Sequence, residues 1–392
     1  MTLPAPTADG RARVAVVATP FGFGPASKAY SIGQVLARHH GLDVAYYGTD
    51  SALDFFTAQP GIHVRPLDDP YPGQGPPALR SADAVVNVLA PELIGTGELA
   101  ARTYYVDSLG FMWGAADVPP DSPLHRVRAY LAQDLFGSAA HLARLGLRGV
   151  IPVSGIVAPP PAIPTPAAPT EGAGVRAPDR TRVLVQLGGL GNPAGHTSGR
   201  VYLALVERLL AAVRNDSVEM NVAMNHANGA FTLHAGMPVR QLSAADFRTA
   251  LGHCDVVLSS PGMTTLVEAS QAGRPYVPLP PQNWSQVLIC RHLAGRSEQS
   301  LWPFLTGPYD HIAEAAPEAE KAVAVQEINR RLGRDDGYLT RYAQLARHAV
   351  GNPRTPDVGA PFGGAHEVAA VVAADLAARR SADELTTEAT AS

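Results

Sequence analysis

The chain has 392 residues, of which 46% are hydrophobic and 17% are charged, and its formal net charge is −4. This composition excludes a disordered or fibrous protein. The negative net charge argues against non-specific electrostatic binding of nucleic acid. A chain of this length exceeds the size that one hydrophobic core normally serves, so we expect two domains. Because the net charge is negative, any site for an anion must be a local group of residues.

Cysteine content and the N-terminal segment bear on the cellular setting. The two cysteines, Cys254 and Cys290, lie in apolar segments and are too few for a disulfide framework or a cysteine-based zinc site. The first residues lack the basic start and apolar core of a signal peptide, and no apolar run approaches the roughly 18 residues of a membrane helix. We therefore expect a cytoplasmic protein without stable membrane insertion.

The first half of the chain alternates apolar strands with helical stretches. A strand is predicted over residues 13–19, a turn rich in Gly and Pro follows it, and a helix is predicted over residues 27–38. Further strands are predicted over residues 43–47, 63–67, 83–89 and 103–107. Strands that are apolar on both faces and alternate with helices indicate a parallel sheet covered by helices. We therefore expect a Rossmann-like domain over residues 1–157.

Residues 158–180 are crowded with Pro and Ala, which excludes a helix or a central strand and predicts an interdomain linker. A second alternation follows the linker. Its predicted strands cover residues 182–187, 220–224, 255–259 and 276–279, and its predicted helices cover residues 243–252, 264–272 and 285–293. We therefore expect a second Rossmann-like domain over residues 181–350, a C-terminal helical extension over residues 351–380 and a disordered polar tail over residues 381–392.

A glycine-rich turn, Gly188-Gly189-Leu190-Gly191, separates a predicted strand from a predicted helix. Small residues let backbone amides approach an anion, and a helix N-terminus adds the positive end of its dipole, so a pyrophosphate would fit. The spacing Gly189-x-Gly191-x-x-Ala194 also imitates a dinucleotide fingerprint. No acidic residue ends the next strand, which argues against a nicotinamide cofactor. A tight turn without a ligand is the alternative.

The most specific motif runs from Asp255 to Pro278. A predicted strand ends in a short polar turn with Gly262, Thr265 follows, and Glu268 comes three residues later on the next predicted helix. The motif resembles the donor-binding signature of nucleotide-sugar glycosyltransferases typified by the UDP-glycosyltransferases and the peptidoglycan enzyme MurG. The resemblance implies that Glu268 accepts hydrogen bonds from both ribose hydroxyls. An acid that merely benefits from a nearby helix N-terminus is the alternative.

The resemblance also assigns residues to the other parts of the donor. Backbone and hydroxyl donors for the phosphates would come from Ser260, Gly262, Met263, Thr264 and Thr265. Gln282 and Asn283 stand where the family carries an Asp-Gln pair that holds the sugar hydroxyls, although Asn283 could instead cap the next helix. Arg240 falls in the loop that contacts the base in this family, and a solvated Arg is the alternative. Ser260 departs from the His that many members have.

The N-terminal half supplies the acceptor site in this family, commonly with a His base after the first strand. Here Gly22, Phe23 and Gly24 form the loop, and Pro25 stands in the His position. Asp107 ends a predicted strand on the side where open parallel sheets bind ligands, so we expect it to replace the missing base. Capping of the next turn is its alternative role.

The resemblance implies the GT-B fold, in which two Rossmann-like domains face a cleft. It further implies an inverting transfer of a sugar from a UDP or dTDP donor to a small-molecule acceptor, as in natural-product biosynthesis. The sequence contains no Asp-x-Asp, so we expect neither a metal nor a cofactor. The expected partners are the nucleotide sugar and the acceptor, without nucleic acid, and the sequence leaves a homodimer open.

Three alternatives remain from the sequence. Without a His base, the acceptor could be a nucleobase-like nitrogen, as in cytosylglucuronate formation, because such a nitrogen needs less help from a base. An enzyme of the same fold could act on the nucleotide sugar alone, as the non-hydrolysing epimerases do. The chain could also be a non-catalytic partner of another transferase.

Overall fold

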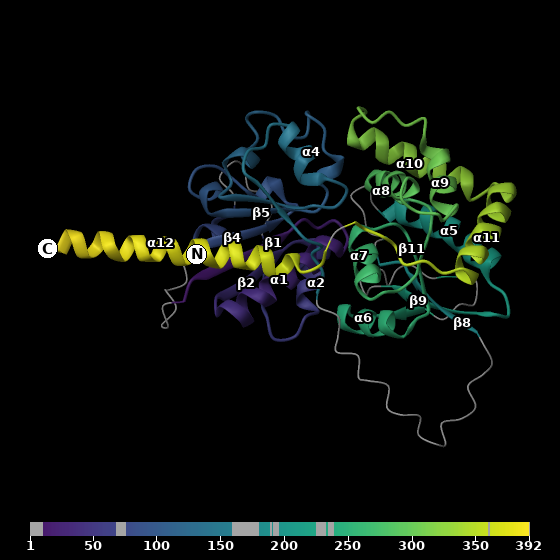
Figure 1. The fold of residues 1–392 in the computed structure, drawn as a ribbon, viewed down its shortest axis with the longest axis horizontal. Helices are drawn as coiled ribbons and strands as arrows, with labels where there is room; N and C mark the ends of the chain where they lie inside the picture. Colours follow the sequence, from purple (N-terminus) through teal and green to yellow (C-terminus); the bar gives the residue numbers. More distant parts are fainter. Residues whose placement is uncertain are drawn as a thin grey trace, which may run out of the picture. The chain divides into compact units, whose positions relative to one another are not determined.

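The computed structural model describes residues 11–67, 76–158, 180–188, 190, 196–224, 233, 239–359 and 361–391. The chain divides into two compact units, a first unit of Met1–Ala158 with Gly359–Ser392 and a second unit of Pro159–Val358. In each unit, helices pack around a parallel sheet (Figure 1). The predicted α/β class with two parallel-sheet domains is therefore confirmed.

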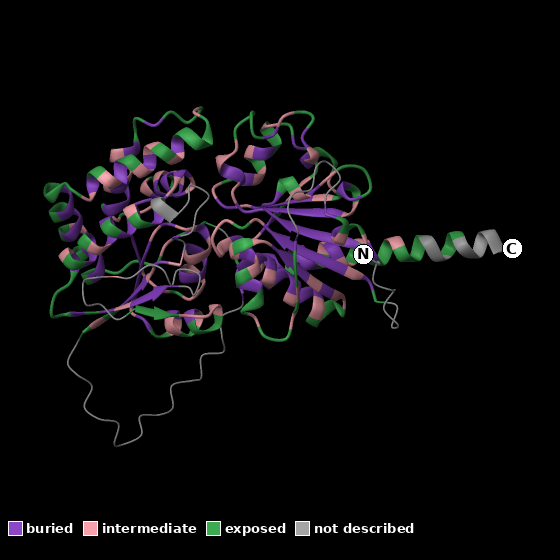
Figure 2. Cartoon of the chain, turned by 180° about the vertical axis from the view of Figure 1, so that it is seen from behind, coloured by how far each residue is buried: buried purple, intermediate pink, exposed green. Residues whose placement is uncertain are grey.

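The described residues of the first unit form a sheet of seven parallel strands in the order β3-β2-β1-β4-β5-β6-β7. The strands are β1 (Arg13–Ala18), β2 (Asp43–Gly48), β3 (His63–Pro66), β4 (Ala84–Val88), β5 (Thr103–Asp107), β6 (Ala129–Gln133) and β7 (Val150–Val153). Every residue of β4 and β5 is buried (Figure 2), as the apolar runs predict for strands covered on both faces. The strand order reverses between β1 and β4.

Helices surround this sheet and include α1 (Gly24–His40), α2 (Asp50–Thr57), α3 (Pro77–Arg80), α4 (Ser138–Arg144) and α12 (Gly364–Ala391). Helix α12 comes from the end of the chain and packs along α1 (Figure 1). The sequence predicts a separate extension over residues 351–380 and a disordered tail after residue 380. The structure differs on both points, since α12 belongs to the first unit and continues to Ala391, a segment whose Ala, Glu and Leu residues favour a helix.

The second unit is built on a sheet of five described strands, all parallel, in the order β10-β9-β8-β11-β12. The strands are β8 (Thr181–Gln186), β9 (Val218–Met224), β10 (Val239–Gln241), β11 (Val256–Ser259) and β12 (Tyr276–Pro278). The helices include α5 (His196–Val213), α6 (Ala244–His253), α7 (Met263–Gln271), α8 (Trp284–Ala294), α9 (Leu301–Thr306), α10 (Glu318–Leu332) and α11 (Asp336–Gly351). The strand order reverses between β8 and β11.

Asp375 anchors α12 to the sheet of the first unit. Its carboxylate accepts hydrogen bonds from the Arg128 Nε at 3.0 and 3.1 Å and from the Tyr104 hydroxyl, and Arg379 lies 3.2 Å away. The Asp375 side chain is 19% exposed. The Arg128 guanidinium holds the pKa of Asp375 below its usual range. These contacts join the end of the chain to strands that lie roughly 250 residues earlier.

Asp375→Asn is expected to lower the melting temperature by about 4–8 °C, since hydrogen bonds to a charged group contribute about 2 kcal/mol. Because the pKa of Asp375 is lowered in the folded state, its contribution is present above the unfolded pKa of about 3.9 and is lost as the pH falls through the folded value. The melting temperatures of wild type and variant should therefore stay apart from pH 7 down to about pH 4 and converge as the pH falls further. Equal melting temperatures at pH 7 would contradict this role.

Glu98→Gln is the matched control for Asp375→Asn. Glu98 pairs with Arg102 at 3.1 Å in the same unit, but its side chain is 89% exposed. Exposed ion pairs contribute little, so we expect the melting temperature to stay within about 2 °C of the wild type.

Candidate functional site

In the second unit, the strand order reverses between β8 and β11, which makes the carboxyl ends of these strands the candidate site. Ligands of open parallel sheets bind at such reversals, because the loops on either side leave in opposite directions. We call the edge where β8, β11 and β12 end the carboxyl edge. The loop after β11 and the start of α7 lie there, as does the loop after β12 that leads to α8.

Helix α7 begins at the carboxyl edge, and no side chain caps its N-terminus. Pro261 stops the strand, Gly262 is the N-cap without a side-chain cap, and Leu266 N closes the first turn on Gly262 O at 3.0 Å. The first amides of an α-helix have no partner within the helix and carry the positive end of its dipole. Thr264 and Thr265, both half-buried, add hydroxyls to this turn.

Gly262 leaves open space in front of this helix N-terminus. A Cβ added at Gly262 would meet nothing closer than 3.9 Å, where the Gln286 Nε2 and the Ser260 carbonyl oxygen lie. The φ angle of Gly262 is −77°, which any L residue adopts. The fold of the described residues therefore does not require glycine here, whereas close approach of a ligand to the backbone would.

Glu268 lies one turn further along α7 and is 8% exposed. It follows Thr264 by four residues and Thr265 by three, so the three side chains share one face of the helix. A carboxylate with so little contact with water must exchange its hydration for hydrogen bonds. Thr264, Thr265 and Glu268 therefore lie together on α7, and their contacts with a donor stay predictions.

The loop after β12 brings Gln282 and Asn283 to the same edge. Asn283 caps α8, because its Oδ1 accepts from the Gln286 N at 3.1 Å and from the Ser285 hydroxyl at 2.8 Å. Gln282 is 5% exposed, and its Nε2 has no hydrogen-bond partner among the residues that the structure describes. A buried amide donor without a partner is rare in native structures. A group outside the described protein atoms, such as a water molecule or a ligand, would supply the missing acceptor.

Four buried tyrosines, which the sequence did not single out, fix these loops through backbone carbonyls. Tyr202 donates to Pro280 O at 2.8 Å, Tyr276 to Ser260 O at 2.6 Å, Tyr309 to Pro281 O at 3.5 Å and Tyr342 to Pro278 O at 3.1 Å. Burial raises the pKa of each phenol, so each hydroxyl stays protonated at neutral pH. Three of the phenols thereby satisfy the backbone carbonyls of Pro278, Pro280 and Pro281.

Four further residues were predicted to bind the nucleotide sugar: Gly188, Gly189, Gly191 and Arg240. Gly188 follows β8 at the carboxyl edge, where its N–H donates to the Gln186 Oε1 at 3.2 Å. Gly189 and Gly191 lie outside the described residues. Arg240 is exposed on β10, three strand positions or roughly 14 Å from β11. Its contact with a base therefore stays a prediction.

The loop after β1 in the first unit turns through Gly22, whose φ is +62°. Ser51 donates its hydroxyl to the Gly22 carbonyl at 3.2 Å, and the Phe23 ring packs edge-on against Phe55 at 5.4 Å. Helix α1 then begins at Gly24, with Pro25 in its first turn, where proline is favoured. The geometry explains why a proline fits here, and the acceptor role of the loop stays a prediction.

Asp107 ends β5 as predicted, but it is fully buried. Its Oδ1 accepts from Leu109 N at 2.7 Å, and its Oδ2 accepts from the Trp113 Nε1 at 2.6 Å and from the Tyr130 hydroxyl at 2.5 Å. Loss of solvation raises the pKa of Asp107, and the three donors oppose that rise. This is the geometry of a carboxylate that fixes the loop after β5. Its role as a base stays a prediction.

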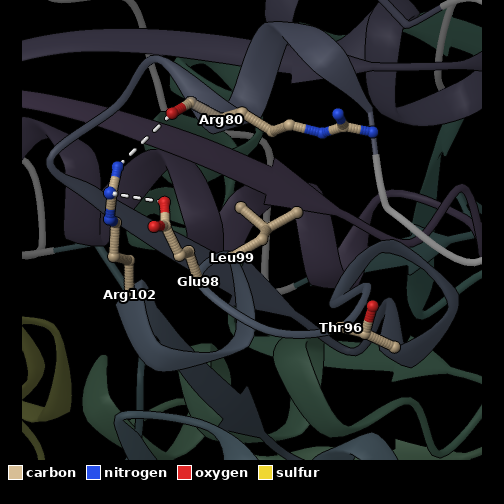
Figure 3. Close-up of a pocket in the computed structure, with 5 residues that line it drawn as sticks. All are labelled: Arg80, Thr96, Glu98, Leu99 and Arg102. Atoms are coloured by element: carbon tan, nitrogen blue, oxygen red, sulfur yellow. Dashed lines mark hydrogen bonds and ion pairs between the residues drawn. The ribbon is translucent and has the colours of Figure 1, made fainter.

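A separate polar pocket of about 230 Å³ lies in the first unit near the amino ends of β4 and β5. Figure 3 shows the Arg102 side chain turned toward Glu98, at 3.1 Å, and toward the Arg80 carbonyl, at 3.4 Å. Thr96 and Leu99 complete its lining. It lies at the opposite edge of the sheet from the loops after β1 and β5.

No group of three or more His, Cys, Asp or Glu side chains is arranged to hold a metal ion within the described part of the chain. No helix in the described ranges is both long and apolar enough to cross a membrane.

Fold and site together define a two-unit parallel-sheet protein whose second unit presents a helix N-terminus, a buried acid and a buried amide at one edge. No protein-family model matches the chain, and no curated protein matches it in sequence. Solved structures that resemble it include the glycosyltransferase SnogD from Streptomyces nogalater, at 19% identity over 93% of this chain and 99% of that chain, with a TM-score of 0.43.

Two further structures illustrate the range of proteins that the chain resembles. UGT71G1 of Medicago truncatula, complexed with UDP-glucose, is 11% identical over 94% of this chain and 99% of that chain, with a TM-score of 0.49. A Listeria monocytogenes protein provisionally described as a UDP-N-acetylglucosamine 2-epimerase is 12% identical over 88% and 98%, with a TM-score of 0.44. Glycosyltransferases are thus among these structures, but at such values the function must be argued from the site.

Proposed function

We propose that the protein is a glycosyltransferase that takes a sugar from a UDP or dTDP donor and passes it to a small-molecule acceptor. The observation that carries the proposal is the Gln282 Nε2, a buried donor without a partner among the described residues, at the same edge as the α7 N-terminus. A sugar hydroxyl would accept from it. The phosphates would lie against the first amides of α7.

In this proposal, the diphosphate and the ribose of the donor each bind a different part of α7. The diphosphate gains negative charge as the anomeric bond breaks, and fixed amide and hydroxyl donors at Gly262 to Thr265 would stabilise that charge without reorganising. Glu268 would accept from the two ribose hydroxyls through charge-assisted hydrogen bonds. The Tyr202 and Tyr276 phenols hold the loops that carry these groups.

Transfer with inversion and an acceptor held by the Gly22 to Gly24 loop complete the proposal. An alcohol acceptor needs a base, for which Asp107 is the predicted residue, whereas a nucleobase-like nitrogen needs less help. A function in natural-product biosynthesis follows from the same resemblance and is part of the proposal.

The proposed function is tested by incubating the protein with UDP, dTDP and GDP sugars and measuring nucleoside diphosphate release with and without a panel of acceptors. Release that rises with one acceptor, together with a glycosylated product by mass spectrometry, is the expected result. Deuterium exchange into the sugar without an acceptor would instead support an epimerase. Binding without any turnover would support a non-catalytic partner.

Gly262→Ala is expected to keep the melting temperature within about 1 °C of the wild type but to weaken UDP binding roughly 10- to 30-fold by calorimetry. The added methyl group meets no protein atom closer than 3.9 Å, so it would crowd only the phosphates. Gly295→Ala is the matched control, because Gly295 also has room for a Cβ, with its nearest neighbour at 3.9 Å, at the opposite end of α8. Equal UDP affinity in all three proteins would overturn the phosphate assignment.

A further inference from the structure

A line of hydrogen bonds crosses the carboxyl edge of the second unit. At β8, Gln186 accepts from Gly188 N through its Oε1 at 3.2 Å and from the Ser259 hydroxyl through its backbone carbonyl at 3.1 Å. The Ser259 hydroxyl also lies 3.1 Å from the Ser260 carbonyl. These contacts tie the loop after β8 to the loop after β11.

Gln286 continues this line to the loop after β12. Its Oε1 accepts from Gln282 N at 2.8 Å, and its Nε2 donates to the Ser260 hydroxyl oxygen at 3.5 Å. The side chain is 7% exposed. The same Nε2 lies 3.9 Å from where a Cβ of Gly262 would be, so the carboxamide stands directly beside the α7 N-cap.

Helix capping alone does not account for both ends of this side chain. Gln286 is the third residue of α8, the position from which a Glu or Gln reaches back to the start of its helix. That role needs only an acceptor oxygen, which a Glu would supply equally well. The donor nitrogen faces Ser260 on another loop, and a Gln provides both functions without bringing a negative charge to a site for a diphosphate.

We propose that Gln286 is a positioning residue of the donor site. By holding Gln282 with one end and Ser260 with the other, it sets the spacing between the loop for the sugar and the loop for the phosphates. It acts through these two residues and not by touching the reacting atoms. The inference rests on the proposed function, since the spacing matters only if both loops bind one donor.

The test compares UDP binding by calorimetry, at a temperature well below melting, for the wild type, Gln286→Leu and Gln299→Leu. Gln299 is a matched control, because its Nε2 also donates one hydrogen bond, to Tyr276 O at 3.3 Å, but at the amino end of β12 and away from both loops. We expect Gln286→Leu to bind UDP at least tenfold more weakly, and Gln299→Leu to bind within twofold of the wild type. Equal affinities, or equal losses in both variants, would overturn the inference.

A second measurement separates positioning from a general loss of stability. If Gln286 acts through Ser260, the combined Gln286→Leu and Ser260→Ala change should weaken UDP binding at least threefold less than the product of the two single effects. Fully multiplicative effects would overturn the inference. Gln286→Asn, which is too short to reach both loops, replaces the Leu variant if that variant does not fold. Absence of nucleotide binding in the wild type would overturn the proposed function itself.

Discussion

Glu268→Ala is expected to weaken UDP binding about 100-fold, the largest loss that we predict for a single side chain. Two charge-assisted hydrogen bonds to the ribose together correspond to about 3 kcal/mol. Glu268→Gln retains one acceptor oxygen and should lose roughly tenfold. Calorimetric titration of the three proteins with UDP measures both effects.

The nucleotide itself supplies the control for Glu268. 2′-Deoxy-UDP lacks one of the two hydroxyls, so wild type should bind it more weakly than UDP, while Glu268→Ala should no longer distinguish the two nucleotides. If Glu268→Ala still discriminated against 2′-deoxy-UDP by the wild-type factor, another group would have to hold the ribose. Glu268 would then be only an acid favoured near a helix N-terminus.

Asp107→Asn is expected to lower the melting temperature by about 6–12 °C. The carboxylate accepts from Leu109 N, the Trp113 Nε1 and the Tyr130 hydroxyl in a fully buried position, whereas Asn turns an amide N–H toward at least one of these donors. A buried donor and a buried amide N–H that face each other without an acceptor together cost about 3 kcal/mol. Thermal melts at neutral pH measure the effect.

The pH dependence of the Asp107 variant has a definite sign. Burial raises the pKa of Asp107 in the folded state, so the stability due to this group is full below the unfolded pKa of about 3.9 and declines as the pH rises through the folded value. Asp107→Asn should lack this decline. If Asp107 is instead the base, the variant would lose sugar transfer at temperatures where it remains folded and binds UDP normally.

Much of the fold could be predicted because the central strands are apolar on both faces. Residues 13–19 and 255–259 show this pattern, and β1 and β11 lie there. Strands β6, β7 and β10 were not predicted. The strand β10 is exposed at all three positions, so its sequence lacks the apolar signal of a buried strand, and only its pairing with β9 defines it.

The candidate site could be predicted where its residues are close in sequence. Gly262, Thr265 and Glu268 follow one strand within a single turn and helix, so their spacing already places them together. Gln286 reaches Ser260 across 26 residues, and the four tyrosines contact carbonyls that are 16 to 78 residues away along the chain. No local pattern distinguishes such a tyrosine from an ordinary core aromatic. Likewise, the Tyr130 hydroxyl that donates a hydrogen bond to the Asp107 carboxylate lies on β6, a strand that was not predicted.

Hydrogen–deuterium exchange with and without UDP tests the central claim most directly, because it locates the bound nucleotide on the chain. We predict that UDP slows exchange in peptides that cover Gly262 to Glu268 and Gln282 to Gln286, and that in Gly262→Ala this protection requires roughly 10- to 30-fold more UDP. Protection confined to other segments, or no protection at UDP concentrations that saturate binding, would contradict a nucleotide diphosphate at the N-terminus of α7.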